Sequence, residues 1–223
     1  MSLTKDDIQR QSERAYSQWK LQWREHAKIH SKYEMKPMSD FEMTGVGKAV
    51  LCVANGYSFE DEIDAIRMHA GKVDIICCDK SLGHLIDNGI SPTFCLVADA
   101  NVNYEKYLKP WESKLQDTIL IGNVCANPMW AERGNWKDRY FFSVMDILKS
   151  EKEWQALSGC PNTMAAGTNV SNALVIAVTQ CDNTGRRNYF GYDKILLIGF
   201  DFCWAPDAKY YAFDQNANGK ANY

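Results

Sequence analysis

The chain has 223 residues, of which 46% are hydrophobic and 24% are charged, and its formal net charge is −3. This length suits one α/β domain with an appendage, and the composition excludes a disordered chain. The slightly acidic balance excludes a general nucleic-acid-binding protein. The longest apolar runs, at 49–54 and 195–200, are far shorter than the roughly twenty residues that a membrane span needs. We therefore expect neither a nucleic-acid partner nor a membrane span.

The N-terminal segment, from Asp6 to about Ser31, has apolar residues at helical spacing on an otherwise charged background. These residues are Ile8, Ala15, Trp19, Trp23 and Ala27. They predict an amphipathic helix within an N-terminal helical extension, residues 1–45. Its apolar stripe is expected to pack on the domain or on a second subunit, which would make a homo-oligomer. His26 and His30 lie four residues apart on it, but no Glu follows His26 as in the metalloprotease motif, so we expect exposed histidines and no metal.

The domain itself, residues 46–223, follows a strand–helix pattern. Continuous apolar runs predict strands at 49–54, 73–78, 94–98, 118–121, 140–145 and 195–200. Helical stripes follow the first two runs, and the segment 169–180 is apolar almost all round, which predicts a buried helix. Alternation of this kind indicates an α/β fold with a doubly wound, mostly parallel, Rossmann-like sheet.

The eight cysteines show neither C-x-x-C spacing nor a zinc-binding pattern with histidine. Four of them, Cys52, Cys77, Cys78 and Cys95, lie inside the predicted strands. A free thiol in such a place behaves as a small hydrophobic group. We therefore expect reduced, buried cysteines and a cytoplasmic protein.

Ligands of doubly wound sheets bind beyond the carboxyl ends of the strands, so the residues that follow each run are the candidate site. The first run is followed by Asn55, Gly56 and Ser58. Gly56 permits a tight turn and close approach of a ligand, and the helix that begins here suits a phosphate. The alternative is an ordinary capped turn without a ligand. Thr168 and Asn169 lie directly before the predicted buried helix. One of them can cap this helix, and the N–H groups at its start could alternatively bind an anion.

Three carboxylates, Asp79, Asp99 and Asp201, follow the second, third and sixth runs. Parallel strands would bring them to one edge of the sheet, where they could form a metal–phosphate site or a site for sugar hydroxyls. Mg²⁺ commonly takes one or two carboxylates together with substrate phosphates. The alternative is that each Asp caps the helix after it.

The same residues carry a resemblance to the bacterial flagellin-modification (Maf) proteins and the related archaeal hydroxymethylpterin diphosphokinase family. The pieces VANGYSFE, CCDKSLGHLIDNGISPT and VADA resemble the family pattern between Val50 and Asp99. Further on, the pieces GTNVSNALVIAV, FGYDKILLIGFDFCW and KYYAFD are similar to the same group and to bacterial sialyltransferases. Together the matching pieces cover about residues 48–214.

The resemblance implies a transferase that uses a nucleotide donor and an unknown acceptor. In a sialyltransferase-like protein, a CMP-activated nine-carbon sugar would be bound by the Asn55–Ser58 turn, Ser81 and the Thr168–Asn169 turn. In a diphosphokinase, ATP and Mg²⁺ would lie on Asp79 and Asp99. Of the carboxylates at the strand ends, we expect Asp99 and Asp201 to carry the catalytic roles.

The position of the last histidine departs from the sialyltransferase pattern. Those enzymes place a catalytic histidine beyond the segment that matches YAFD, whereas the last histidine here is His84. Three expectations remain open: the domain is truncated at its C-terminus, the protein binds without catalysis, or the chemistry differs.

Overall fold

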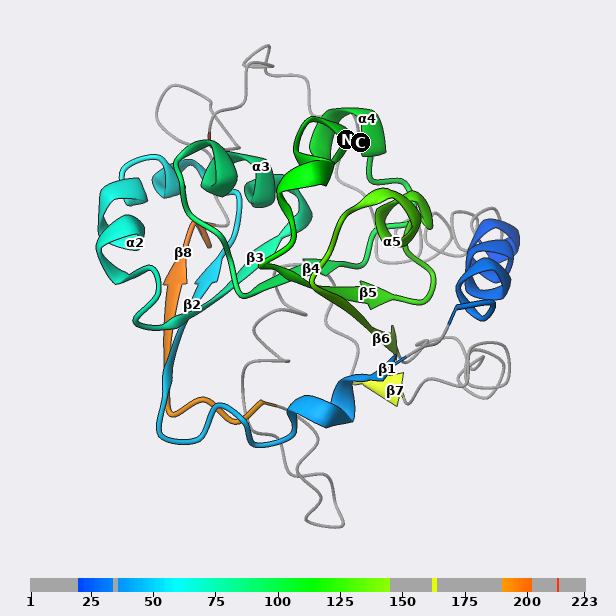
Figure 1. Ribbon diagram of the computed structural model, residues 1–223, viewed down its shortest axis with the longest axis horizontal. Coiled ribbons are helices and arrows are strands. Elements are labelled where there is room, and N and C mark those ends of the chain that lie inside the picture. Colours follow the sequence, from blue (N-terminus) through cyan, green and yellow to red (C-terminus); the bar gives the residue numbers. More distant parts are fainter. Residues whose placement is uncertain (1–19, 34–35, 145–161, 164–189, 202–211, 213–223) are drawn as a thin grey trace, which may run out of the picture.

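The computed structural model describes residues 20–33, 36–144, 162–163, 190–201 and 212. Their strands form one eight-stranded sheet in which every pairing is parallel (Figure 1). The elements, in chain order, are β1 (Lys36–Pro37), η1 (Met38–Phe41), β2 (Ala49–Val53), η2 (Tyr57–Phe59), α2 (Ile63–His69), β3 (Asp74–Cys78), α3 (Asp79–Asp87), β4 (Phe94–Val97), α4 (Tyr104–Tyr107), η3 (Lys109–Lys114), β5 (Ile119–Asn123), α5 (Met129–Arg133), β6 (Asp138–Val144), β7 (Asn162–Thr163) and β8 (Lys194–Ile198). A strand lies at each of the six predicted runs.

The strand order is β1-β6-β5-β4-β3-β2-β8, with β7 paired to the end of β6. From β3 to β6, each strand lies beside the strand before it in the chain. The last described strand, β8, returns to the other side of β2 and pairs with it from Ala49 to Val53. The order therefore reverses at β2, which confirms the predicted doubly wound sheet. The crevice at such a reversal is where ligands of this architecture bind.

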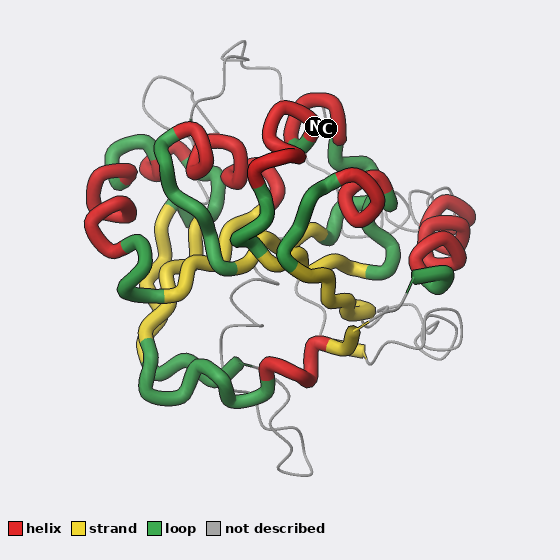
Figure 2. Tube along the Cα trace, in the orientation of Figure 1, coloured by secondary structure: helices red, strands yellow, loops and turns green. Residues whose placement is uncertain are grey.

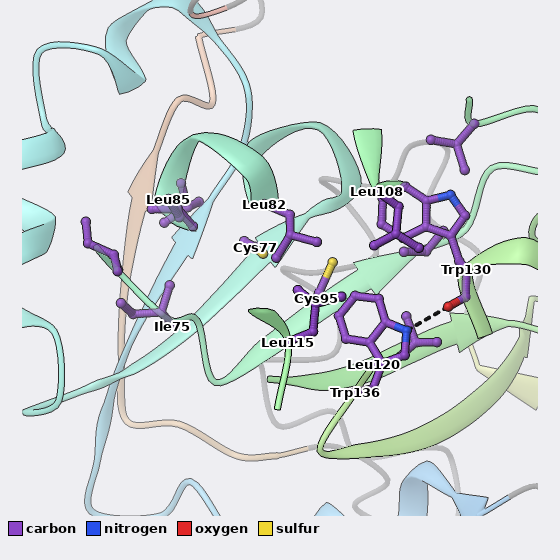
Figure 3. Close-up of a cluster of buried hydrophobic side chains, with 14 of the residues drawn as sticks. Ile75, Cys77, Leu82, Leu85, Cys95, Leu108, Leu115, Leu120, Trp130 and Trp136 are labelled. Atoms are coloured by element: carbon purple, nitrogen blue, oxygen red, sulfur yellow. Dashed lines mark hydrogen bonds between the residues drawn. The ribbon is translucent and has the colours of Figure 1, made fainter. Parts of the chain in front are cut away.

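The helices α2, α3, α4 and α5 lie on one face of the sheet (Figure 2). This follows from right-handed connections that all run in the same direction across the sheet. Between these helices and the strands lies a core that includes Leu82, Leu85, Trp130 and Trp136 (Figure 3). The indole N–H of Trp136 donates to the carbonyl of Trp130 at 2.6 Å, which fixes α5 against the loop that leads into β6.

The opposite face of the sheet carries a second apolar cluster. Val50, Ile76 and Leu96 contribute from three neighbouring strands, and Phe190 and Tyr192 pack on them. The helix predicted at 169–180, which would lie between β6 and β8 in the chain, falls outside the described residues.

The four cysteines predicted to be reduced and buried are free and buried, as expected; they are Cys52, Cys77, Cys78 and Cys95. Burial raises the pKa of the Cys52 thiol to about 12 and holds the pKa of the Cys78 and Cys95 thiols well above the usual range. These groups are therefore core filling and poor nucleophiles. Cys160, Cys181 and Cys203 lie outside the described residues.

Residues 20–30 form the described part of the predicted N-terminal helix. The ring Nδ1 of His26 lies 3.0 Å from the carbonyl oxygen of Cys125, and the Nδ1 of His30 lies 2.7 Å from that of Val124. Carbonyl oxygens only accept, so each Nδ1 carries the donated proton. His30 is 1% exposed, and the prediction of exposed histidines is wrong for it. The histidines dock the helix on the loop after β5.

The residues before 46 also reach the sheet itself, because β1 pairs with β6 at Lys36–Tyr140 and Pro37–Phe141. A two-residue strand has no periodic pattern, and for this reason β1 is not predicted from the sequence. In the described part of the chain, no helix has both the length and the apolar character that a membrane crossing requires.

Candidate functional site

The candidate site lies where the order of the strands reverses, at the carboxyl ends of β2 and β8. Beyond the two strands, the backbone ladder continues between the turns that follow them. The amide of Ala54 donates to the carbonyl of Ile198 at 2.8 Å, and the amide of Gly56 donates to the carbonyl of Gly199 at 2.9 Å. Two segments far apart in sequence are therefore held side by side at this edge.

Asp201 and Ser58, both predicted site residues, are brought together here. The backbone N–H of Ser58 donates to Oδ2 of Asp201 at 2.9 Å, and the Ser58 hydroxyl donates to Oδ1 at 2.5 Å. Hydrogen bonds to an ionised carboxylate are shorter and stronger than neutral ones. The amide and hydroxyl of Ser58, which the sequence analysis considers as donors to a phosphate at this turn, therefore bind Asp201 instead.

Gly56 is required by the close approach of the two turns. A Cβ at this position would lie 2.3 Å from Oδ2 of Asp201 and 2.4 Å from the carbonyl oxygen of Gly199. Its backbone, with φ −70° and ψ 162°, is open to any residue, so the requirement is one of space. The space that a side chain would fill is taken by the carboxylate of Asp201.

Asn55 precedes this glycine and offers an unused hydrogen-bonding group. Its backbone carbonyl accepts from the amide of Ala212 at 3.0 Å. Its side-chain oxygen Oδ1 is buried and has no hydrogen-bond partner among the residues that the structure describes. Buried polar atoms nearly always have a partner, and those that do not call for an explanation such as an absent ligand. An amide oxygen accepts, so it suits a hydroxyl or amino group of a ligand.

Asp79 and Ser81 lie at the start of α3, below the surface. Asp79 is 3% exposed, and its Oδ1 accepts from the amide of Lys80 at 2.7 Å. The Ser81 hydroxyl is fully buried, accepts from the amide of Cys78 at 3.1 Å and lies 3.0 Å from the carbonyl oxygen of Val53. Ser81 therefore ties the end of β2 to the beginning of α3.

Asp99 is the exposed carboxylate of the predicted set. It follows β4, and its Oδ1 accepts from the amide of Asn101 at 2.8 Å. The side chain of Asn101 in turn accepts from Gln22 of the N-terminal helix at 3.0 Å. The backbone carbonyl of Asp99 accepts from Asn127, in the loop after β5, at 3.3 Å. The Asp99 loop is thus held from two sides while its carboxylate faces solvent.

The fit of these residues to Mg²⁺ is poor. In the described ranges, no group of three or more His, Cys, Asp or Glu side chains is placed to hold a metal ion. Asp79 is buried with one oxygen on a backbone amide, which leaves Asp99 as the exposed member of the predicted pair. A two-carboxylate metal site at Asp79 and Asp99 does not match this arrangement.

Two lysines that are not predicted from the sequence lie near the same edge. The Nζ of Lys80 lies 5.9 Å from the centroid of the Tyr107 ring, and the Nζ of Lys106 lies 4.8 Å from it. Lys80 belongs to the first turn of α3, and Lys106 to α4, which follows the Asp99 loop. Their charges suit a phosphate near the ends of β3 and β4. The only sequence signal for Lys80 is its place directly after Asp79.

The last histidine of the chain and two further predicted site residues complete the comparison with the sequence. His84 lies in the second turn of α3, where its ring is 6.5 Å from that of Phe59 and burial lowers its pKa. Thr168 and Asn169 fall outside the described residues.

Comparisons with known proteins agree with this architecture. The chain is similar in fold to the MAf glycosyltransferase from Magnetospirillum magneticum AMB-1, with a TM-score of 0.50 and 16% sequence identity, over 86% of this chain and 29% of that one. It thus spans less than a third of the length of that glycosyltransferase. No curated protein sequence matches the chain. The model of the family described as 6-hydroxymethylpterin diphosphokinase MptE-like matches residues 22–207. This match extends over most of the chain, which therefore belongs to the MptE-like family.

Proposed function

We propose that this protein is a nucleotide-dependent transferase whose donor nucleotide binds at the carboxyl edge of the sheet, between the Asn55–Ser58 turn and the Asp99 loop. The observation that carries this proposal is the buried Oδ1 of Asn55 at the reversal of strand order, which has no partner within the described part of the chain. Membership of the MptE-like family supports a nucleotide substrate, and the fold shared with a glycosyltransferase agrees with it.

The leading candidate reaction is transfer of a nonulosonate-type sugar from a CMP-sugar. The acceptor-only oxygen of Asn55 suits a ribose hydroxyl or the amino group of cytosine. The exposed Asp99 carboxylate would take the proton of the acceptor hydroxyl as the new carbon–oxygen bond forms. The bond between the sugar and the phosphate breaks at the same time, and its electron pair leaves with CMP. Lys80 and Lys106 would stabilise the charge that develops on the phosphate.

The second candidate is transfer of a diphosphate group from ATP to a pterin-like alcohol, and family membership favours it. The alcohol oxygen would attack the β-phosphate, and AMP would leave. Mg²⁺ usually neutralises charge in such a reaction. The placement of Asp79 fits that ion poorly, and for this reason we rank this candidate second.

Calorimetric titration with CMP, a CMP-sugar and ATP, each with and without Mg²⁺, distinguishes the candidates. We expect CMP binding that does not depend on metal and that weakens by about tenfold in Asn55→Ala, the worth of one hydrogen bond. The matched control is Asn135→Ala, which replaces an exposed asparagine in the loop that leads into the amino end of β6. ATP binding that needs Mg²⁺ and is lost in Asp99→Asn would favour the second candidate. Absence of binding by all three ligands would contradict the proposal.

A further inference from the structure

The link between Ser58 and Asp201 joins residues that are 143 positions apart. It is the last rung of a ladder that begins with the pairing of β2 and β8 and continues through Ala54 and Gly56. The first rungs use backbone groups only. The last rung replaces the backbone carbonyl with a carboxylate side chain, which reaches both the amide and the hydroxyl of one serine.

The directions of the two carboxylate oxygens define what Asp201 does. Oδ1 accepts from the Ser58 hydroxyl, and Oδ2 accepts from the Ser58 amide while lying against the Cα of Gly56. A group that takes a proton from a substrate needs an oxygen directed at that substrate. Both oxygens of Asp201 are directed instead at the turn after β2.

We propose that Asp201 is a positioning residue, which holds the Asn55–Ser58 turn in the shape that presents the Asn55 amide to the nucleotide. This inference rests on the proposed function. It gives Asp201 a role different from the catalytic one predicted from its place at a strand end. Asp201 acts through Ser58 and Gly56, and the residue that touches the ligand is Asn55.

The variants Asp201→Asn and Asp201→Ala separate positioning from catalysis. An asparagine can keep both links, because its oxygen accepts from the Ser58 amide and its NH₂ group donates to the Ser58 hydroxyl, which also accepts. It cannot act as a base. Alanine breaks both links. We expect CMP affinity to fall by about tenfold or more in Asp201→Ala and to stay within about threefold of the unmutated protein in Asp201→Asn.

Two further variants complete the design. Asp193→Ala removes a carboxylate that also accepts from a backbone amide, that of Gly47 at 2.9 Å, but at the opposite end of β8, and we expect it to leave the affinity unchanged. In Ser58→Ala combined with Asp201→Ala, the loss of affinity should be smaller than the sum of the single losses, because the two residues act as one unit. Thermal unfolding of each variant establishes that it is folded.

The inference is overturned if Asp201→Asn loses as much affinity as Asp201→Ala, or if the losses of the two alanine variants add. A second readout does not require a nucleotide: the backbone amide NMR signals of Asn55, Gly56 and Ser58. We expect these signals to move strongly in Asp201→Ala and little in Asp201→Asn. Signals that stay in place in Asp201→Ala would overturn the inference. If the unmutated protein binds no nucleotide, the proposed function fails by itself, and the amide signals alone decide whether Asp201 shapes the turn.

Discussion

Replacement of Gly56 by alanine tests the close packing at the reversal of strand order. The added Cβ would lie 2.3 Å from Oδ2 of Asp201 and 2.4 Å from the carbonyl oxygen of Gly199. One of these atoms belongs to the backbone of the neighbouring turn, so the contact cannot be relieved by rotation of a side chain alone. Overpacking of this kind costs about 1–3 kcal/mol. Displacement of the Asp201 carboxylate adds about 1 kcal/mol, less than the roughly 1.5–3 kcal/mol of a hydrogen bond to a charged group because the site is partly solvated.

We therefore expect Gly56→Ala to lower the free energy of unfolding by about 2–4 kcal/mol, measured by urea denaturation. The control is Gly71→Ala, where, apart from its chain neighbours, no atom of the described residues lies within 4 Å of the added Cβ and the positive φ of 77° is unfavourable. That change should cost about 1 kcal/mol. Adding Asp201→Ala to Gly56→Ala removes one of the two clashes, so the combined loss should be less than the sum. A free energy of unfolding for Gly56→Ala within about 0.5 kcal/mol of the unmutated value would refute this account of the turn.

Three other variants or measurements test the described packing. Burial lowers the pKa of His30, so its environment favours the neutral ring. This preference stabilises the fold above the ordinary histidine pKa of about 6.5, and the stabilisation is lost as the pH falls through the lowered pKa. We expect urea unfolding to show a smaller loss of stability between about pH 7.5 and about pH 5 in His30→Gln than in the unmutated protein, and an equal loss would contradict this. Ser81→Ala should lower the free energy of unfolding by about 1–3 kcal/mol, because it leaves buried backbone groups without a partner, whereas the exposed Ser91→Ala should have almost no effect. In alkylation of the native protein followed by peptide mapping, the half-buried Cys125 should react well before Cys52, and equal rates would contradict the burial of Cys52.

Strands β2 to β5 could be predicted from the sequence because they are buried on both faces, and β8 keeps the same apolar run although its Leu196 and Leu197 are about half exposed. Continuous apolar runs mark such strands directly, and each of the six runs corresponds to a strand of the sheet. The short strands β1 and β7 could not be found in this way, since two residues carry no pattern.

The internal arrangement of the candidate site was only partly predictable. The rule for strand ends selected Ser58 and Asp201, but their mutual contact depends on β8 lying beside β2, which local sequence does not encode. In the sequence, Ser81 cannot be distinguished from an exposed serine at the start of a helix, although its hydroxyl is buried. The contact of His30 with the loop after β5 could not be predicted either, because its partner is a backbone carbonyl, which any residue could supply.

The place of β8 in the sheet has a consequence for the order of folding. Each strand from β3 to β6 pairs with the strand before it in the chain, so this part of the sheet can grow by closing short loops. The outer edge of β2 pairs with β8, which begins about 140 residues later. Contacts between such distant residues form slowly, because closing a long loop costs entropy. During synthesis, the full pairing of β8 with β2 can form only after residue 198 has left the ribosome. The turn that carries Asn55 is therefore completed among the last parts of the fold, after the core on the α3 side has already formed.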